Sequence, residues 1–507
     1  MLAKVLSAGV LGVEAFTVAV EVDVALGLPA YNLVGLPTNA VKEGGVRVRA
    51  ALAHSGFALP PRRITVNMAP ADVRKDGAAY DLPVAIGILA ALEQLPHAAL
   101  DGLILLGELS LDGTLRRVAG GLPVAIHARA IGARGLVMPK ECASEAAAVS
   151  DLPVYAASTL PEVAAFLRGE IELPRASLVE RPAQPDASAV DLAEVRGLET
   201  ARRALEVAAA GAHNILFIGP PGSGKSMLAR RLSTVLPPLD EREAIETTSI
   251  YSAAGKLDGA SLLETRPFRA PHHDVSVAGL VGGGPVPRPG EISLAHHGVL
   301  FLDELPEFKR PALEALRQPL EDRRVTIVRA KAAITYPASF SLVGALNPCP
   351  CGYRGSPLRA CTCSTDTVRR YLARLSGPLL DRIDLHLEVP HVDYRALRAD
   401  RDGESSSAVR ERVTAAQAIQ RRRMRGQERY ANASLGPRAL MKHCALDAAA
   451  DRHLEACVKR FGLSGRAVHR ILRVARTIAD LAGRERLASS DVAEAIALRA
   501  LDRPVAA

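Results

Sequence analysis

Hydrophobic residues recur along the first 172 positions with two different periods. From Phe16 to Val22 every second residue is apolar, which predicts a strand with one buried face. Short apolar runs indicate two more strands, and a helical period returns in three segments. The expected strands are 64–68 and 103–106, and the expected helices are 39–54, 82–95 and 122–130. This mixture favours an α/β or α+β domain over residues 1–172.

The middle of the chain contains the continuous apolar runs that a fully buried strand requires. Residues 215–218 are all apolar, and 227–232 then show the mixed pattern of a helix. Two later runs, 298–302 and 340–346, predict strands of the same buried type. Strands buried on both faces are typical of a parallel sheet. We therefore expect an α/β core with a parallel sheet over residues 190–390.

Beyond the core the pattern becomes helical, so residues 391–507 are expected to form a helical lid. Residues 173–189, which precede the core, carry three prolines among small and charged residues. That composition predicts a linker between the first domain and the core. The expected helices of the lid are 409–425, 437–442, 446–461, 464–482 and 490–498.

Composition excludes several classes of protein. With 48% hydrophobic and 23% charged residues, the chain of 507 residues is of ordinary globular composition. No apolar run reaches the roughly 18 residues of a membrane span, and the start of the chain lacks a signal-peptide layout. We therefore expect a cytoplasmic protein without membrane contact. The net charge of +8 is concentrated in residues 391–507, which indicates either a nucleic-acid partner or an arginine-rich solvated surface.

A glycine-rich loop joins the strand 215–218 to its helix and indicates a nucleotide site. Its G-x-x-x-x-G-K-S spacing between strand and helix is that of a phosphate-binding loop, whose N–H groups bind a polyphosphate. Lys225 would contact the β- and γ-phosphates of ATP, and the Ser226 hydroxyl would coordinate Mg²⁺. The loop consists of Gly219, Pro220, Pro221, Gly222, Ser223, Gly224, Lys225 and Ser226. These residues predict a nucleoside triphosphatase.

Two carboxylates follow the apolar run 298–302 and complete the chemistry that hydrolysis needs. Asp303 would hold Mg²⁺, directly or through water, and Glu304 would polarise the attacking water. The alternative is an acidic pair on the surface at the end of a strand, which the phosphate-binding loop disfavours.

A resemblance to the Lon-protease domain is carried by residues 75–85, 107–113 and 118–122. In that family a serine and a lysine form the catalytic dyad. Here Ala79 stands at the serine position and Pro123 at the lysine position, so peptide hydrolysis is not expected. The resemblance implies an α+β scaffold that serves assembly or contact with nucleic acid.

More distinctive motifs lie between the two halves of the nucleotide site, at 266–273, 282–284 and 289–297. Together with the acidic strand and the strand that ends at Asn347, they resemble the magnesium-chelatase-like branch of AAA+ ATPases. In detail they are similar to the ComM/YifB family of bacterial competence proteins, and the similarity extends over essentially the whole chain. The two His-His pairs in these motifs are interpreted as loop or core residues rather than metal ligands.

The resemblance implies catalytic roles for three further side chains. Asn347 corresponds to the first sensor, which orients water against the γ-phosphate, or it is a turn asparagine. Arg382 corresponds to an arginine finger, which acts on the nucleotide of a neighbouring subunit, or it forms a salt bridge with Asp381 or Asp384. Arg466 corresponds to the second sensor on the γ-phosphate, or it is a surface arginine of the lid.

The family also implies a β-hairpin before the first sensor, for which 324–329 and 333–336 provide two strands. Arg329 and Lys331 would lie near its tip. In a ring such tips point into the pore, where cations contact a DNA backbone without reading bases. An exposed hairpin with incidental charge is the alternative.

Four of the seven cysteines lie in one short loop as two C-x-C pairs. Four thiols this close in a cytoplasmic protein favour a structural Zn²⁺ over disulfides. Because C-x-C is tighter than the usual C-x-x-C, reduced or redox-labile thiols are the alternative. The residues are Cys349, Cys351, Cys361 and Cys363.

By this resemblance we expect a ring-forming AAA+ ATPase, a homohexamer, that uses ATP and Mg²⁺ to translocate on single-stranded or branched DNA. Its task would be helicase-like branch migration in homologous recombination during natural transformation, alongside recombination proteins. A chelatase-type motor that remodels a protein partner is the alternative. An ATP-dependent protease is disfavoured by the missing dyad.

Overall fold

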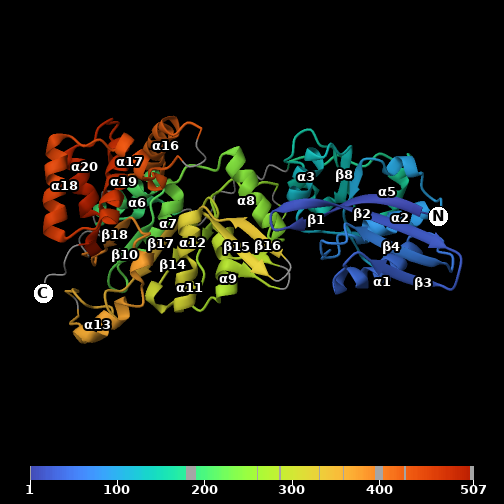
Figure 1. Cartoon of the computed structure of the whole chain (residues 1–507), viewed down its shortest axis with the longest axis horizontal. Helices are drawn as coiled ribbons and strands as arrows, with labels where there is room; N and C mark the ends of the chain where they lie inside the picture. The colour runs from blue at the N-terminus through green and yellow to red at the C-terminus, as the bar shows by residue number, and fades with distance from the viewer. Residues whose placement is uncertain are drawn as a thin grey trace.

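The computed structural model describes the chain apart from residues 1, 179–189, 258, 260, 285–286, 330–331, 358, 394–402, 427–429 and 503–507, and apart from the side chains of 329, 332 and 502. The molecule is elongated, and its two termini lie at opposite ends of the long axis (Figure 1). An N-terminal unit, a central sheet and a group of C-terminal helices follow one another along this axis (Figure 1).

A seven-stranded sheet forms the centre of the N-terminal unit, in the order β3-β4-β2-β1-β5-β8-β9. Strand β2 pairs antiparallel with β1 and β4, and the remaining pairs of this sheet are parallel. The predicted alternation is confirmed in β2, where Val18, Val20 and Val22 are fully buried. The strands of the unit are β1 (Leu2–Leu11), β2 (Glu14–Ala25), β3 (Ala30–Val34), β4 (Arg63–Ala69), β5 (Leu103–Leu105), β6 (Glu108–Leu109), β7 (Leu115–Arg116), β8 (Gly135–Pro139) and β9 (Val154–Ala157).

Helices cover this sheet, and α2 is buried along its whole length because it packs against β1, β2 and α1. The helix predicted over 82–95 ends at Ala91, and Glu93 then adopts a left-handed φ of 58°, which a continuing helix does not allow. The helices of the unit are α1 (Asn39–His54), α2 (Asp81–Ala91), α3 (Gly121–Ala130), α4 (Lys140–Ala146) and α5 (Leu160–Leu167).

The central sheet has five strands in the order β11-β14-β17-β10-β18, and every pair in it is parallel. The three apolar runs predicted as buried strands form β10, β14 and β17, with side chains that are almost entirely buried. A mixed α/β fold with a parallel sheet is therefore confirmed for the core. The strands are β10 (Ile215–Ile218), β11 (Phe268–Arg269), β14 (Val299–Leu302), β17 (Ser341–Leu346) and β18 (Leu385–Glu388).

Two small antiparallel pairs, β12–β13 and β15–β16, accompany this sheet. The expected hairpin is present as β15 and β16, but its tip at 330–331 lies outside the described residues. These strands are β12 (Gly282–Gly283), β13 (Arg288–Pro289), β15 (Arg324–Arg329) and β16 (Ala332–Pro337). The helices of the core are α6 (Glu199–Gly211), α7 (Lys225–Val235), α8 (Glu241–Ala253), α9 (Val277–Val281), α10 (Glu291–Leu294), α11 (Arg310–Ala315), α12 (Arg317–Asp322), α13 (Thr365–Leu372) and α14 (Gly377–Leu380).

The C-terminal helices share a hydrophobic core with the central sheet. One cluster of buried side chains includes Ile215 of β10, Val413 of α16 and Ile478 of α19. The predicted helical pattern is confirmed here, with ends that differ by up to three residues. The helices are α16 (Ser406–Arg423), α17 (Pro437–His443), α18 (Ala448–Phe461), α19 (Gly465–Leu481) and α20 (Ser489–Ala497).

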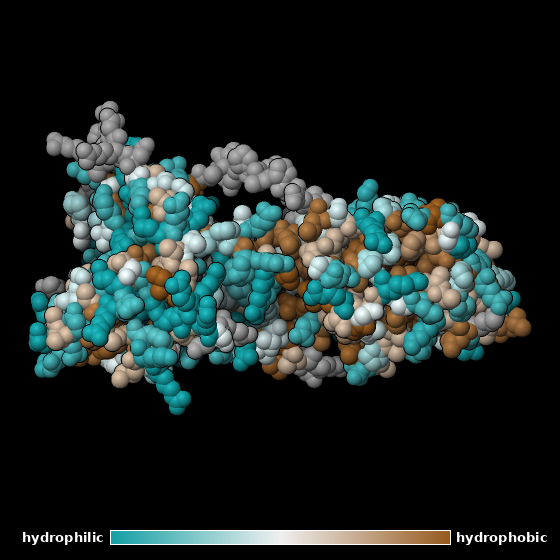
Figure 2. Space-filling model, turned by 90° about the horizontal axis from the view of Figure 1, so that it is seen from above, coloured by the Kyte–Doolittle hydropathy of each residue, from teal (hydrophilic) through white to brown (hydrophobic). Residues whose placement is uncertain are grey.

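The N-terminal unit is packed directly against the core. Val13, between β1 and β2, packs on the cluster that contains Ile334 of β16, and the Gly120 N–H donates to the carbonyl of Ser252 in α8 at 3.0 Å. In a space-filling view, hydrophobic residues are most evident over the N-terminal unit and its junction with the core (Figure 2). Among the helices that the structure describes, none is both long and apolar enough to cross a membrane.

Candidate functional site

The phosphate-binding loop lies where β10 ends and α7 begins. Gly222 and Gly224 have left-handed φ values of 76° and 90°, which a residue with a side chain rarely adopts. Gly219 is required for a different reason, because a Cβ there would lie 2.3 Å from the carbonyl oxygen of Val389. The loop residues singled out from the sequence therefore form one turn that leads into the N-terminus of α7.

Lys225, the first residue of α7, is held above this turn. Its Nζ donates to the carbonyl oxygens of Gly219 and Pro220 at 2.7 and 2.9 Å, and to Asn347 Oδ1 at 3.1 Å. Burial lowers the pKa of Lys225, and the nearby carboxylates of Asp303 and Glu304 oppose that shift. The ammonium therefore contacts the amide of Asn347 and interacts electrostatically with two acidic side chains, all of them far away in the sequence.

Asp303 and Ser226 form the second half of the site. The Ser226 hydroxyl donates to Asp303 Oδ2 at 2.7 Å, across the gap between α7 and the end of β14. A hydroxyl and a carboxylate are hard oxygen ligands, which Mg²⁺ accepts together with water and phosphate oxygens. This pair fits the metal that the sequence predicts at these two residues.

Glu304 follows directly and has an unusual backbone. Its φ is 51°, in the left-handed region, and its N–H donates to Asp303 Oδ1 at 2.9 Å. The side chain is 56% exposed, and its Oε2 lies 3.7 Å from Nδ1 of His273. This carboxylate is therefore accessible to water at the rim of the site.

The sheet topology explains why these residues meet. Strand β17 lies between β10 and β14, so Asn347 at its end is flanked by the phosphate-binding loop and by Asp303. Ligands of α/β proteins bind at the carboxyl ends of parallel strands. A cavity of about 820 Å³ opens beside the loop, and its lining includes Leu198, Pro220 and His391. Its size suits a nucleotide base and ribose, and neither Leu198 nor His391 stands in a sequence motif that indicates this position.

The two candidate arginines lie together in a different place. A cavity of about 380 Å³ is lined by Arg382, Arg466, Arg470 and Asp381, and residues 219–226 are not among its lining. Arg466, at the start of α19, is 80% exposed and lies 3.4 Å from Asp381. Although burial opposes it, Arg470 and Arg466 hold the pKa of Asp381 below its usual value. The cavity is therefore rich in cations, as an anion site requires.

Arg382 forms an ion pair within the subunit, but not with either acid considered from the sequence. It pairs with Glu321 of α12 and donates to the carbonyl of Pro378 at 2.7 Å. Asp381 instead pairs with Arg470, and Asp384 lies 3.0 Å from His213. The folded chain brings α12 beside Arg382, and nothing in the local sequence signals that contact.

The four clustered cysteines converge as a zinc site requires. Cys349 Sγ lies 3.3 Å from Cys351 Sγ and 3.6 Å from Cys361 Sγ. The four Sγ atoms, including that of Cys363, all lie within 4.8 Å of one another. A tetrahedral zinc with Zn–S bonds of about 2.3 Å separates its sulfurs by about 3.8 Å, so the four thiols lie close enough together to share this metal.

The loop of these cysteines touches the nucleotide site. Gly352 has a left-handed φ of 83°, and a Cβ on it would lie 2.6 Å from Pro221. Hydrogen bonds from the backbone of Tyr353 and Thr362 lower the pKa of the Cys351 thiol to about 5. Although backbone hydrogen bonds oppose the shift, desolvation and hydrogen bonds with the neighbouring thiols raise the pKa of Cys361 to about 11 and also raise that of Cys363, so Cys351 is the one of these three thiols that ionises first. A thiolate is the form that binds a metal.

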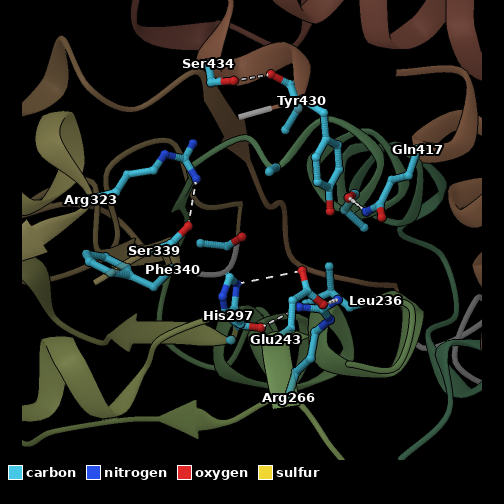
Figure 3. A pocket seen from close by; sticks show the side chains of 15 residues that line it. Leu236, Glu243, Arg266, His297, Arg323, Ser339, Phe340, Gln417, Tyr430 and Ser434 are labelled. Atoms are coloured by element: carbon cyan, nitrogen blue, oxygen red, sulfur yellow. Dashed lines mark hydrogen bonds and ion pairs between the residues drawn. The ribbon is translucent and has the colours of Figure 1, made fainter. Parts of the chain in front are cut away.

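Each His-His pair lies with an acidic residue at a spacing that could also hold a metal, Glu246 for His296 and His297 and Asp274 for the other pair, but hydrogen bonds within the protein occupy the first pair. Figure 3 shows His297 beside Glu243 and Arg266, in a pocket between the core and α16. His296 Nδ1 accepts the Ser339 N–H at 2.9 Å, and burial lowers its pKa to about 4, so the neutral ring carries its proton on Nε2, facing Glu246. A metal on that nitrogen would have to displace the proton. This pair is a buried hydrogen-bonded anchor, and the other pair lies in a loop beside Glu304.

The remaining residues singled out from the sequence are the expected DNA contacts and the two positions of the missing dyad. The side chain of Arg329 and all of Lys331 lie outside the described residues. Ala79 packs on a hydrophobic cluster and Pro123 is buried in α3. These two positions therefore provide neither a nucleophile nor a base.

Comparisons with known proteins cover nearly the whole chain. Three family models match, described as magnesium chelatase, subunit ChlI (residues 191–397), subunit ChlI of Mg-chelatase (residues 20–142) and magnesium chelatase, subunit ChlI C-terminal (residues 403–499). Competence protein ComM of Haemophilus influenzae is 47% identical over 99% of this chain and 98% of its own length. The uncharacterized protein YifB of Salmonella typhimurium is 46% identical over the same shares of the two chains. The Holliday junction branch migration complex subunit RuvB of Saccharopolyspora erythraea is 32% identical over 30% of this chain and 38% of its own length.

Proposed function

The chain belongs to the ComM/YifB family of magnesium-chelatase-like AAA+ ATPases, and from this premise we propose that it is a ring-forming motor that hydrolyses ATP to move along DNA. The family implies ATP and Mg²⁺ as cofactors. The observation that supports hydrolysis is a pair of hydrogen bonds at the start of α7, one from Lys225 to Asn347 and one from Ser226 to Asp303.

In the proposed site Lys225 and the N–H groups of residues 219–226 bind the phosphates. Ser226 and Asp303 hold Mg²⁺, which neutralises charge on the β- and γ-phosphate oxygens. Glu304 polarises the attacking water, and Asn347 orients that water against the γ-phosphate. The accessible carboxylate of Glu304 supports this role, because the water must reach it.

We assign Arg382 and Arg466 to the nucleotide of a neighbouring subunit. They share one cation-rich cavity, whose lining does not include the phosphate-binding loop of their own chain. A guanidinium from a neighbour neutralises charge that develops on the transferred phosphoryl group. Turnover then depends on a closed ring, for which six subunits are the expected number.

Three observations support DNA as the substrate along which the motor moves. One relative is named a competence protein, and another is named a branch migration subunit. The C-terminal helices carry an excess of positive charge. The hairpin β15–β16 is a separate antiparallel pair, whose tip would carry Arg329 and Lys331. We propose that the motor acts on single-stranded or branched DNA and drives branch migration during natural transformation, with recombination proteins as partners.

We propose that the N-terminal unit is a Lon-like scaffold without a dyad, because Ala79 and Pro123 stand at the positions of the serine and the lysine. We further propose that Cys349, Cys351, Cys361 and Cys363 hold a structural zinc, which would stiffen the loop that packs on Pro221.

A chelatase-type motor without DNA remains the second candidate, because all three family models are described by a chelatase subunit.

The ATPase rate measured with and without single-stranded and forked DNA, at low salt, separates these two functions. We expect DNA to stimulate the wild type, Lys225→Ala to be inactive, and Lys331→Ala to lose only the stimulation. Lys459→Ala, on the exposed face of α18, is the matched control and should behave as wild type. An ATPase rate that DNA does not change would favour the protein-remodelling motor instead.

A further inference from the structure

We propose that Asn214 is a positioning residue for Arg382, because it fixes the backbone of the arginine to the strand that leads into the phosphate-binding loop. The inference rests on the proposed role of Arg382 at the nucleotide of a neighbouring subunit. It goes beyond that role because it names the residue that connects this arginine to the nucleotide site of its own chain.

Asn214 directly precedes β10, the strand that lies between β17 and β18 in the central sheet. Its Nδ2 donates to the carbonyl oxygen of Arg382 at 2.8 Å, and its Oδ1 accepts the N–H of Leu342 in β17 at 2.8 Å. Its own carbonyl oxygen accepts the N–H groups of Asp384 and Leu385 at 3.1 and 3.0 Å. These contacts tie the segment that carries Arg382 to two strands of the sheet.

The preceding residue, His213, strengthens the same connection. It is completely buried, and its Nδ1 lies 3.0 Å from Oδ2 of Asp384, two residues after Arg382. Its Nε2 lies 2.8 Å from Oγ1 of Thr477 in α19. A buried polar network whose members are paired is rigid, so the backbone around Arg382 has little freedom to shift.

Because the strands are parallel, the two ends of the sheet carry different parts of the site. Asn214 and Arg382 precede β10 and β18, whereas the phosphate-binding loop and Asn347 follow β10 and β17. The strand β10 spans about 13 Å at the usual rise per residue. Asn214 therefore sets the distance between Arg382 and the phosphate-binding loop of the same chain.

The guanidinium of Arg382 is held less firmly than its backbone. It pairs with Glu321, whose side chain is 66% exposed, and an exposed ion pair is weak. Asn214, Arg382 and Glu321 line the same cation-rich cavity. A phosphate in this cavity can therefore replace Glu321 while the backbone of Arg382 stays in place, and a group held in its reaction geometry in advance is what catalysis requires.

Steady-state ATPase kinetics and nucleotide binding on the full-length protein test this role. Asn214→Ala should lower kcat by about 10- to 100-fold, because a small displacement of a catalytic group has effects of this size. Its affinity for a fluorescent ATP analogue should equal that of the wild type, since the phosphate-binding loop is intact. Asn214→Asp keeps an acceptor for the Leu342 N–H, but an ionised carboxylate cannot donate to Arg382, so kcat should fall here too.

Asn67→Ala is the matched control. Asn67 is a half-buried asparagine of β4 that donates to Glu21 at 2.8 Å, within the N-terminal unit. Its loss removes a comparable side-chain hydrogen bond far from Arg382, so kcat should stay at the wild-type value.

Mixed rings separate a positioning role from a general structural one. Asn214→Ala mixed with Lys225→Ala should recover part of the wild-type rate, because the intact arginine of one variant meets the intact loop of the other. Mixed with Arg382→Ala it should recover nothing, since neither variant supplies a well-placed arginine.

Three results would overturn the inference: a wild-type kcat in both Asn214 variants, a loss of nucleotide affinity in both, or no recovery with Lys225→Ala where Arg382→Ala does recover. A wild type without ATPase activity, or a fully active Arg382→Ala variant, would instead overturn the proposed function. The two failures are therefore distinguishable in one set of assays.

Discussion

At the scale of single residues, the chemistry of a side chain depends on the groups that contact it after folding, as the four clustered cysteines show. Cys349 is fully buried, while its partners Cys351 and Cys361 are partly exposed at the rim of the same loop. Their sulfurs approach one another closely without any disulfide. Four thiols at this separation repel one another once they ionise, and a divalent metal removes that repulsion.

Metal analysis of the purified protein tests the zinc site. We expect about one zinc per chain, because four protein ligands complete a structural site. Cys361→Ser should lose the metal, and chelation of the wild type should lower both its melting temperature and its ATPase rate, since the loop packs on Pro221. Cys457→Ser, a partly buried cysteine of α18, should keep the zinc. Equal metal contents in the two variants would contradict the assignment.

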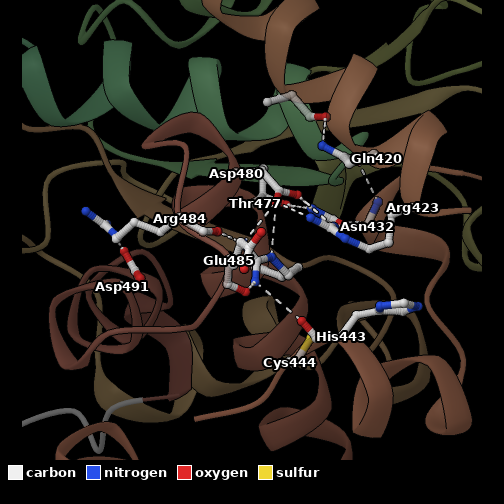
Figure 4. A network of polar contacts seen from close by, with 12 residues as sticks. Gln420, Arg423, Asn432, His443, Cys444, Thr477, Asp480, Arg484, Glu485 and Asp491 are labelled. Atoms are coloured by element: carbon white, nitrogen blue, oxygen red, sulfur yellow. Dashed lines mark hydrogen bonds and ion pairs between the residues drawn. The ribbon is translucent and has the colours of Figure 1, made fainter. Parts of the chain in front are cut away.

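At the scale of elements, a buried polar network joins the C-terminal helices to each other. Figure 4 shows Asp480 of α19 at its centre, surrounded by Arg423 of α16, Asn432 and Thr477. Asp480 accepts from Arg423 at 2.9 Å, from Asn432 at 2.8 Å and from Arg476 at 3.1 Å. Thr477 in turn contacts His213, just before β10, so the network extends toward the strand that carries the phosphate-binding loop.

Removing the central carboxylate should destabilise this part of the molecule strongly. Asp480→Ala leaves buried guanidinium groups without their partner, and the expected loss is about 3–5 kcal/mol. Urea unfolding followed by circular dichroism would show a lower midpoint. Asp451→Ala, at an exposed position of α18, should change stability by less than about 0.5 kcal/mol. Similar midpoints for both variants would mean that the network carries little of the stability.

At the scale of the whole molecule, we propose that one chain presents two incomplete halves of a catalytic centre. The phosphate-binding loop and Asp303 form one half, and the cavity of Arg382 and Arg466 forms the other. In the described chain Arg382 is paired with Glu321, which is 66% exposed. A solvent-exposed ion pair is weak, so a phosphate from a neighbouring subunit can replace it.

Mixing two inactive variants tests whether Arg382 acts on the nucleotide of a neighbouring subunit. Arg382→Ala should lower kcat by about 10³-fold or more, and Lys225→Ala should abolish turnover. Mixed in one ring, the two inactive variants should recover part of the wild-type rate, because an intact loop then meets an intact arginine at some interfaces. Recovery should increase with protein concentration. If no activity returns in rings shown to be mixed, Arg382 acts within its own subunit.

Features carried by neighbouring residues could be predicted from the sequence better than contacts between distant segments. The strands β10, β14 and β17 follow from continuous apolar runs, and the alternation in β2 marks its buried face. The phosphate-binding loop is recognisable because its glycines and Lys225 are neighbours in the chain. Helix ends were predicted less well, as Glu93 shows, because a single left-handed residue can end a helical pattern.

The sequence by itself determined the chemistry that neighbouring residues carry: a phosphate-binding loop, an acidic pair after a buried strand, a cysteine cluster, and Ala79 and Pro123 in place of a dyad. Only the tertiary structure decided that Arg382 meets Glu321, 61 residues away, and that His273 approaches Glu304. Periodicity and spacing report on the local backbone and its buried face. Contacts between distant segments depend on strand order and packing, which no local pattern encodes.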